Sequence, residues 1–155
     1  MIRVTDGAAA EVAFETSEAF ADVVSDKIDA GSRLEAASGR AVDWQAWFEA
    51  WSVTYGNGES KPTHLEVTAK DEFHAVIPWA ELKDAFVVYA QADGQPLAKA
   101  YPLRLYTPNG SSECLNVKSV VELRIHDDAS LGEKATFGFR NVLTPEQLFA
   151  GRRSE

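Results

Sequence analysis

The sequence predicts an α+β fold, in which a mixed β-sheet packs with short helices in a single domain spanning residues 1–155. Short segments of alternating apolar and polar residues recur along the chain between turn-forming residues, a pattern typical of β-strands. One segment, residues 44–51, instead repeats its apolar residues at helical spacing. With 45% hydrophobic and 25% charged residues, a chain of 155 residues is long enough to bury a core.

The first part of the chain is predicted to contain short strands and one helix. The strands follow from alternation of apolar and polar residues. The helix follows from Thr16 and Ser17, whose hydroxyl groups suit an N-cap, and from the apolar residues spaced three and four apart behind them. The predicted elements are strands at residues 1–5, 11–15 and 33–37 and a helix at residues 17–28.

The segment after Asp43 has the clearest helical pattern in the sequence. Trp44, Trp47, Phe48 and Trp51 lie at positions i, i+3, i+4 and i+7, which places four aromatic rings on one helical face. Burying each such side chain stabilises a fold by about 1.5–3 kcal/mol. The stripe, which begins directly after Asp43, therefore predicts a core-facing helix and not a ligand-binding box.

The middle of the chain is predicted to hold an exposed loop, a β pair and a short helix. The loop, YGNGESKP, is rich in turn formers, and two alternating segments follow it, separated by a turn near Asp71. Proline is tolerated in the first turn of a helix, so Pro78 is predicted to begin the helix PWAELKDA. The predicted elements are a loop at residues 55–62, strands at residues 64–68 and 73–77, and a helix from residue 78.

Residues 86–125 form the clearest β region and are also the least acidic part of the chain. They carry four Lys and Arg against three Asp and Glu, a net charge of +1, whereas residues 1–72 carry six against fourteen, a net of −8. A small anion is therefore expected in the later region. Alternation places Arg104 away from the core, and it groups Lys118 with Val120 on a polar face. The predicted strands are residues 86–92, 101–106 and 117–125, with a turn at residues 92–95.

The end of the chain shows weaker patterns. Residues 135–139 alternate like an edge strand. Thr144, followed by proline and glutamate, is predicted to cap a helix, and residues 152–155 are expected to form a frayed tail.

Composition excludes several classes of function. A net charge of −9 without a Lys/Arg-rich run argues against nucleic-acid binding, which depends on neutralising phosphates. No run of about 18 apolar residues is present, so we expect a soluble, cytoplasmic protein with no membrane contact. One cysteine and three scattered histidines give no metal-ligand spacing, which argues against a zinc or haem site. The signature motifs of serine hydrolases, P-loop proteins and zinc proteases are also absent.

Five short blocks occur in an order that points to a family. They correspond to a tryptophan with a short amphipathic helix, an acid, aromatic and apolar-proline run, an NG-x-PL turn, a (H)GxPxR block and a VKW strand. Together they resemble the molybdopterin-binding domain of the sulfite oxidase family of oxidoreductases, over roughly residues 10–126. The blocks are residues 44–51, Asp71-Glu72-Phe73 with Ile77-Pro78, residues 93–97, residues 101–105, and Val117-Lys118 with Val121 and Ile125.

The resemblance also defines where this chain departs from the family. In the family, a cysteine thiolate ahead of the tryptophan helix ligates molybdenum, as a soft donor should. The matching stretch here, residues 33–39, contains no cysteine. Cys114 lies far downstream, so it does not carry over as that ligand, and a free cysteine is usually a small buried hydrophobic residue. We therefore assign no metal ligand and no catalytic residue.

The resemblance implies a cofactor-binding set of three cations. Arg104 and Lys118 match family positions that help hold the pterin cofactor and its phosphate, and Lys99 replaces the family's histidine before GxPxR. Ser119 stands where the family has a tryptophan. A guanidinium and an ammonium suit a phosphate or a small oxyanion. The alternative interpretation is that these residues are solvated cations on a strand face.

These observations lead to a main functional hypothesis and two alternatives. The main hypothesis is a catalytically degenerate protein with the sulfite-oxidase-type fold that binds a small anion, a pterin or a protein partner. The first alternative is a molybdopterin-dependent oxidoreductase in which another group completes the metal shell. The second is a subunit that contacts a partner protein. Molybdopterin is the cofactor that the resemblance implies, and the residues by themselves assign none.

Overall fold

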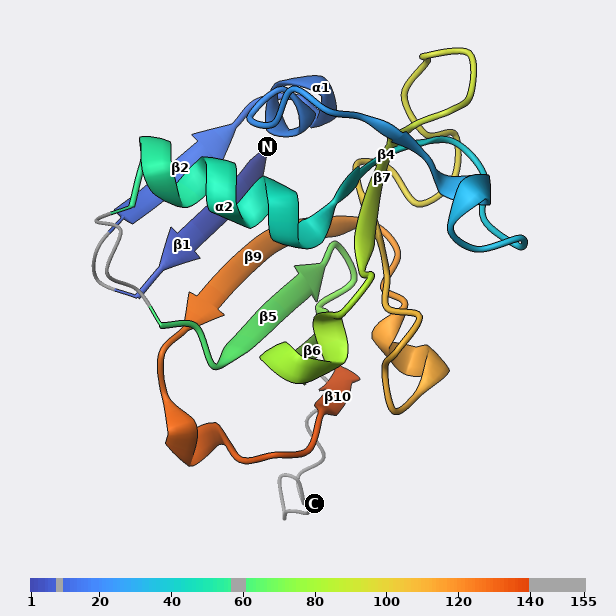
Figure 1. The fold of residues 1–155 in the computed structure, drawn as a ribbon. Helices are drawn as coiled ribbons and strands as arrows, with labels where there is room; N and C mark the ends of the chain where they lie inside the picture. Colours follow the sequence, from blue (N-terminus) through green and yellow to red (C-terminus); the bar gives the residue numbers. More distant parts are fainter. Residues whose placement is uncertain (8–9, 57–60, 140–155) are drawn as a thin grey trace.

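In the part of the chain that the structure describes, two β-sheets and two α-helices form the fold (Figure 1), which confirms the predicted α+β class. The structure is a computed structural model, and it describes residues 1–7, 10–56 and 61–139. The larger sheet has six strands in the order β10-β6-β5-β9-β1-β2, and the smaller sheet has four in the order β3-β4-β7-β8. Side chains from both sheets and both helices share the main hydrophobic core.

The larger sheet is mixed, as predicted. β1 and β9 pair in parallel, whereas the other neighbouring strands pair antiparallel. Alternation sends one set of side chains into the core, for example Leu65 and Val67 of β5 and Leu123 and Ile125 of β9, all of which are buried. The strands are β1 (Ile2–Asp6), β2 (Ala10–Phe14), β5 (His64–Ala69), β6 (Phe73–Pro78), β9 (Val120–His126) and β10 (Thr136–Phe139).

The smaller sheet is covered by apolar side chains on both faces. Its strand β7 reads FVVYA, and every residue of it is buried. Val87 and Tyr89 belong to the main core, while Phe86 and Val88 belong to a second, smaller apolar cluster on the other face. The strands are β3 (Ile28–Asp29), β4 (Arg40–Asp43), β7 (Phe86–Ala90) and β8 (Arg104–Tyr106).

The aromatic helix is confirmed as α2 (Trp44–Thr54). The Asp43 side chain accepts a hydrogen bond from the backbone N–H of Ala46 at 2.9 Å and so caps the helix N-terminus. The other helix is α1 (Ser17–Ala21), and the short 3₁₀ turns are η1 (Ala30–Ser32), η2 (Trp79–Leu82), η3 (Glu113–Leu115) and η4 (Ala129–Leu131). In Figure 1, α2 lies across the larger sheet in front of β1 and β2. The four rings Trp44, Trp47, Phe48 and Trp51 are at most 8% exposed.

Two predictions for residues 17–37 are wrong, and both errors involve the smaller sheet. The helix predicted at residues 17–28 ends at Ala21, because Ile28 pairs with Ala41 as strand β3. The strand predicted at residues 33–37 is absent, and a turn closed by the Ala37 N–H to Leu34 carbonyl bond occupies this place. The strand forms instead at β4, where its backbone pairs with β7.

Three further boundaries differ from the prediction. The helix expected from Pro78 is reduced to η2, because Pro78 remains the last residue of β6. Only β8 of the predicted strand 101–106 is regular, and Tyr101 is 42% exposed, so it does not share the buried face of Leu103. Val120 is buried and not on a polar face, because Ser119 has φ +59° and the register with β5 shifts there.

Other predictions for this part of the chain agree with the structure. The β5–β6 pair is confirmed with its turn near Asp71, whose side chain accepts from the Phe73 N–H, and β10 is confirmed as an edge strand. Residues 57–60 of the predicted loop, the predicted cap at Thr144 and the tail at 152–155 lie outside the described residues. Within the described part of the chain, no helix is long and apolar enough to cross a membrane.

Candidate anion-binding site around Arg104

A backbone bridge makes neighbours of two of the cations singled out in the sequence. Leu105 and Val117 exchange both of their backbone hydrogen bonds, at 2.9 and 3.0 Å, in an antiparallel bridge. Arg104 and Lys118 each lie next to that bridge, so antiparallel register sets them opposite one another. Leu105 and Val117 are buried, and their neighbours therefore belong to the opposite face.

Arg104 is the more enclosed of the two cations. Its guanidinium carbon lies 4.7 Å from the centroid of the Tyr106 ring, a cation–π distance that holds the side chain against the strand. The Nε atom of Arg104 is buried and has no hydrogen-bond partner. A buried donor without a partner is costly, and a ligand or water that accepts from it removes that cost. Arg104 therefore has unused capacity to bind an acceptor.

The space beside Arg104 is a pocket with a volume of about 410 Å³. The loop after β8 forms its wall, and the Asn116 side chain fixes this loop by accepting from the backbone N–H and the hydroxyl of Thr107 at 2.8 and 3.2 Å. Glu113 is the acidic residue in the pocket wall. Besides Arg104, the other polar side chains there carry hydroxyl groups or, at Asn116, an amide. The pocket is lined by Leu34, Ala36, Arg104, Tyr106, Thr107, Pro108, Gly110, Ser112, Glu113 and Asn116.

The stretch that replaces the family's metal-binding cysteine lies in the wall of this pocket. Leu34 and Ala36 belong to it, and they bring only apolar side chains. Arg33, the cation of the stretch, is ion-paired with Asp43. Among the described residues no group of three His, Cys, Asp or Glu could hold a metal ion. These side chains supply no thiolate for molybdenum, and Arg104 is the group of this wall that can pair with an oxyanion.

Lys118 lines a second pocket, which shares Asn116 with the first. This pocket has a volume of about 210 Å³, and Asn116 lines both it and the pocket of Arg104. The Lys118 side is also lined by Asp71, Phe73 and Cys114, so an acid and a thiol accompany the ammonium group there. Asn116 therefore borders both pockets.

The structure separates Lys99 from this pair. Lys99 is exposed in the segment between β7 and β8, and it lines neither pocket. Cys114 is exposed in η3, so the expectation of a small buried hydrophobic residue is wrong. Thr107 and Asn116 were not recognised in the sequence, since only the turn formers Pro108 to Gly110 signal that a loop lies between them.

No protein-family model, curated protein or solved structure matches this chain. The resemblance to the sulfite oxidase family therefore rests on the five sequence blocks alone.

Proposed function

We propose that this chain is a small-anion-binding protein of the sulfite-oxidase type without redox catalysis, and that Arg104 and Lys118 hold the anion. The single observation that supports it best is the Arg104 Nε, buried without a hydrogen-bond partner beside a pocket of about 410 Å³. The ligand class is a phosphate or a comparable oxyanion, and the sequence resemblance favours the phosphate of a pterin. The proposal includes a cytoplasmic location, because the single cysteine cannot form an intramolecular disulfide.

The chemistry of the two cations supports binding and not turnover. A guanidinium group donates two parallel hydrogen bonds to an oxyanion, and the adjacent ammonium group adds a point charge. Protonated Arg and Lys neutralise a phosphate but do not ligate molybdenum. The wall contributed by Leu34 and Ala36 supplies no replacement for a thiolate. The proposal therefore includes no redox step. The alternative is a molybdopterin-dependent oxidoreductase in which another group completes the coordination of the metal.

Replacing Arg104 by Ala should weaken anion binding about tenfold or more, because charged hydrogen bonds contribute about 1.5–3 kcal/mol. Calorimetric titration of phosphate, sulfate and a pterin phosphate into the wild type and Arg104→Ala measures the difference. Wild-type binding should also weaken with added salt. Arg124→Ala removes an exposed cation on β9 that already pairs with Glu122, so its affinity should match the wild type.

Further variants and one assay define the outcomes of this experiment. Cys114→Ser should leave both affinity and stability unchanged, since the thiol is exposed and lines only the Lys118 side. Lys99→Ala tests whether the third cation belongs to the site. A loss of anion affinity in this variant would add Lys99 to the anion-binding site. Equal affinity of wild type and Arg104→Ala would remove the proposed site. Molybdenum-dependent turnover of sulfite or a sulfoxide, in protein from a molybdopterin-producing host, would favour the oxidoreductase.

A protein partner is the second candidate ligand, and the edge of the larger sheet favours it. On β10, Phe137 and Phe139 are 45% and 49% exposed, and both rings pack on Phe73 of the neighbouring strand. An uncharged edge strand with exposed aromatic rings is suited to pairing with another strand. Sedimentation of the wild type and Phe137→Lys tests it: a larger wild-type particle that the variant reduces to one chain supports a partner. A single-chain particle in both excludes self-association.

A further inference from the structure

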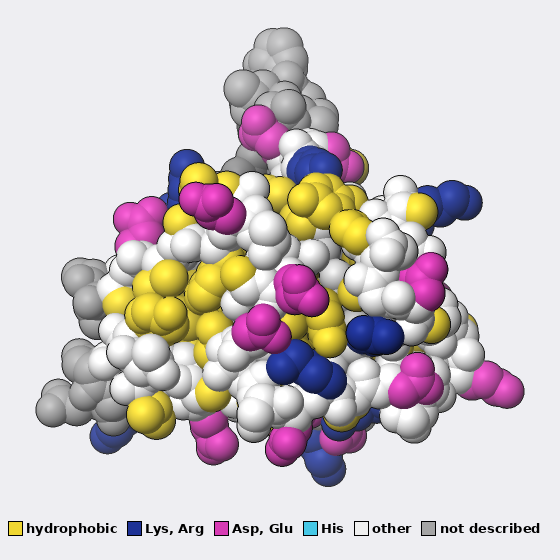
Figure 2. Space-filling view, turned by 90° about the horizontal axis from the view of Figure 1, so that it is seen from above, with side chains coloured by type: hydrophobic (Ala, Val, Ile, Leu, Met, Phe, Trp, Pro, Cys, Tyr) yellow, Lys and Arg dark blue, Asp and Glu magenta, His cyan; other side chains and the backbone are white. Residues whose placement is uncertain are grey.

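A third pocket lies beside α1 and is lined by acidic and basic side chains. It has a volume of about 230 Å³ and lies between α1, β4, β7 and the segment after β7. Figure 2 looks down on the end of the molecule where α1 lies, and acidic and basic side chains stand next to one another there around exposed apolar surface. The lining residues are Thr16, Ser17, Glu18, Asp22, Arg40, Tyr89, Ala90, Gly94, Pro96 and Tyr101.

The positive charge of this pocket is Arg40, and the turn after β7 holds it in place. The Arg40 Nε donates to the Ala92 carbonyl at 3.3 Å, and within the described residues neither terminal nitrogen has a hydrogen-bond or ion-pair partner. Gly94 has φ +90°, and a Cβ there would lie 3.2 Å from Nη1 of Arg40, so the glycine backbone packs closely on the guanidinium. The turn is itself closed by the Gly94 N–H to Gln91 carbonyl bond.

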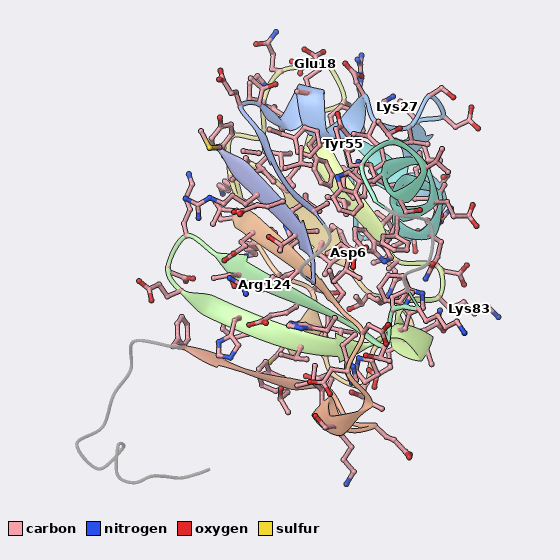
Figure 3. All side chains as sticks on the ribbon, turned by 90° about the vertical axis from the view of Figure 1, so that its left-hand side faces the viewer. Asp6, Glu18, Lys27, Tyr55, Lys83 and Arg124 are labelled. Atoms are coloured by element: carbon pink, nitrogen blue, oxygen red, sulfur yellow. The ribbon has the colours of Figure 1, made fainter. Side chains whose placement is uncertain are left out.

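The negative charges come from α1 and from the residue that follows it. Glu18 and Asp22 both line the pocket and are exposed. Glu18 forms no ion pair within the described residues. Asp22 forms a long ion pair with Lys27, at 3.7 Å, and its side chain is 68% exposed. Figure 3 places Glu18 and Lys27 at the same end of the molecule. Neither acid is paired with Arg40, although the acids and Arg40 line the same pocket.

Aromatic side chains form the body of the pocket. Tyr89 is 7% exposed, and the Lys70 Nζ lies 4.7 Å from the ring centroid of Tyr101, which steadies that wall from outside the pocket lining. Burial raises the pKa of Tyr89, with a smaller lowering by Arg40 and smaller increases from Asp22 and Glu18. The phenol is therefore within electrostatic reach of all three charges, and it remains a hydrogen-bond donor at neutral pH.

We propose that this pocket binds a small zwitterion of the α-amino-acid class. The carboxylate of the ligand would pair with the terminal nitrogens of Arg40, and its ammonium group would lie between Glu18 and Asp22. A simple anion would meet the two acids, and a simple cation would meet the guanidinium, so either is disfavoured by a like charge. Tyr89 and Tyr101 provide contact area for the carbon skeleton, and a volume of about 230 Å³ suits a ligand of this size.

The test is an amide NMR titration of the full ¹⁵N-labelled chain at low salt. Glycine, L-serine and L-phenylalanine should produce saturable shifts at the Ser17 and Gly94 amides at millimolar concentrations, while acetate and methylammonium should not. Arg40→Gln should weaken binding at least tenfold, as should the double change Glu18→Gln with Asp22→Asn. All three side chains are exposed, so these variants should fold.

Controls keep this site distinct from the anion site. Arg124→Gln, on β9 and well away from Glu18 in Figure 3, should bind the amino acids as the wild type does. Arg104→Ala should also bind them normally, because Arg104 lines the other pocket. Acetate that binds as tightly as the amino acids, equal affinity in Arg40→Gln, or no saturable shift at Ser17 and Gly94 would each overturn the proposal.

Discussion

Replacing Trp47 by Ala is expected to lower the free energy of unfolding by about 3–5 kcal/mol. The Trp47 side chain is fully buried, and its indole N–H donates to the Phe20 carbonyl at 2.7 Å. Its ring stacks on Phe20 at 4.3 Å and on Trp44 at 5.6 Å between ring centroids. The substitution therefore removes the packing of the ring against Phe20 and Trp44 and leaves a buried carbonyl without its donor.

Urea denaturation of the wild type and Trp47→Ala measures this effect. Val53→Ala is the matched control, because Val53 lies on the same helix with 85% of its side chain exposed, and its substitution should change stability by less than about 0.5 kcal/mol. A loss below about 1 kcal/mol for Trp47→Ala would mean that this helix face is exposed in solution. The aromatic stripe would then be a candidate partner surface.

Replacing Gly39 by Ala should have an effect of similar size for a different reason. Gly39 has φ +112°, and a Cβ there would lie 2.5 Å from the Ala90 carbonyl oxygen and 3.0 Å from Cγ1 of Val88. The Ala90 carbonyl belongs to β7, a central strand that does not shift freely. Backbone strain costs about 1–3 kcal/mol, and displacing packed neighbours costs about 1–3 kcal/mol more. The expected loss is about 2–6 kcal/mol.

Two other glycines separate the contributions to this loss. Gly132 has φ +91° with no atom within 4 Å of an added Cβ, so Gly132→Ala should show the backbone strain alone. Gly138 has neither a positive φ nor a close neighbour, so Gly138→Ala should be nearly neutral. Urea midpoints of the three variants give the comparison. If Gly39→Ala and Gly132→Ala lose equal stability, the close approach to β7 plays no part.

Patterns confined to a few neighbouring residues predicted the fold best. The spacing of Trp44, Trp47 and Trp51 depends on one helix, and the β5–β6 pair depends on two adjacent segments with a short turn. Each of these elements buries its apolar side in the way that its own period requires. The boundaries of α2 and of the β5–β6 pair were therefore close to the prediction.

Contacts between distant residues explain what the sequence did not reveal. Ile28 continues a helical pattern, but its pairing with Ala41 draws it into a strand. The positive φ at Ser119 turns the Val120 side chain from the predicted polar face into the core. In the candidate site, the family resemblance pointed to Arg104 and Lys118. The position of Asn116 in both pocket walls depends on the bridge between Leu105 and Val117, which no local pattern encodes.

The position of β9 in the larger sheet determines when that sheet can form during synthesis. β9 lies between β5 and β1, so it joins the β1–β2 and β5–β6 pairs into one sheet. Arg3 pairs with Glu122, and the ribosome therefore releases β1 long before its parallel neighbour exists. A two-stranded pair is marginally stable in water, so a nascent chain that has not reached Val120 holds two such pairs with open edges. We expect these chains to be the form on which chaperones act, with cooperative folding following the release of β9.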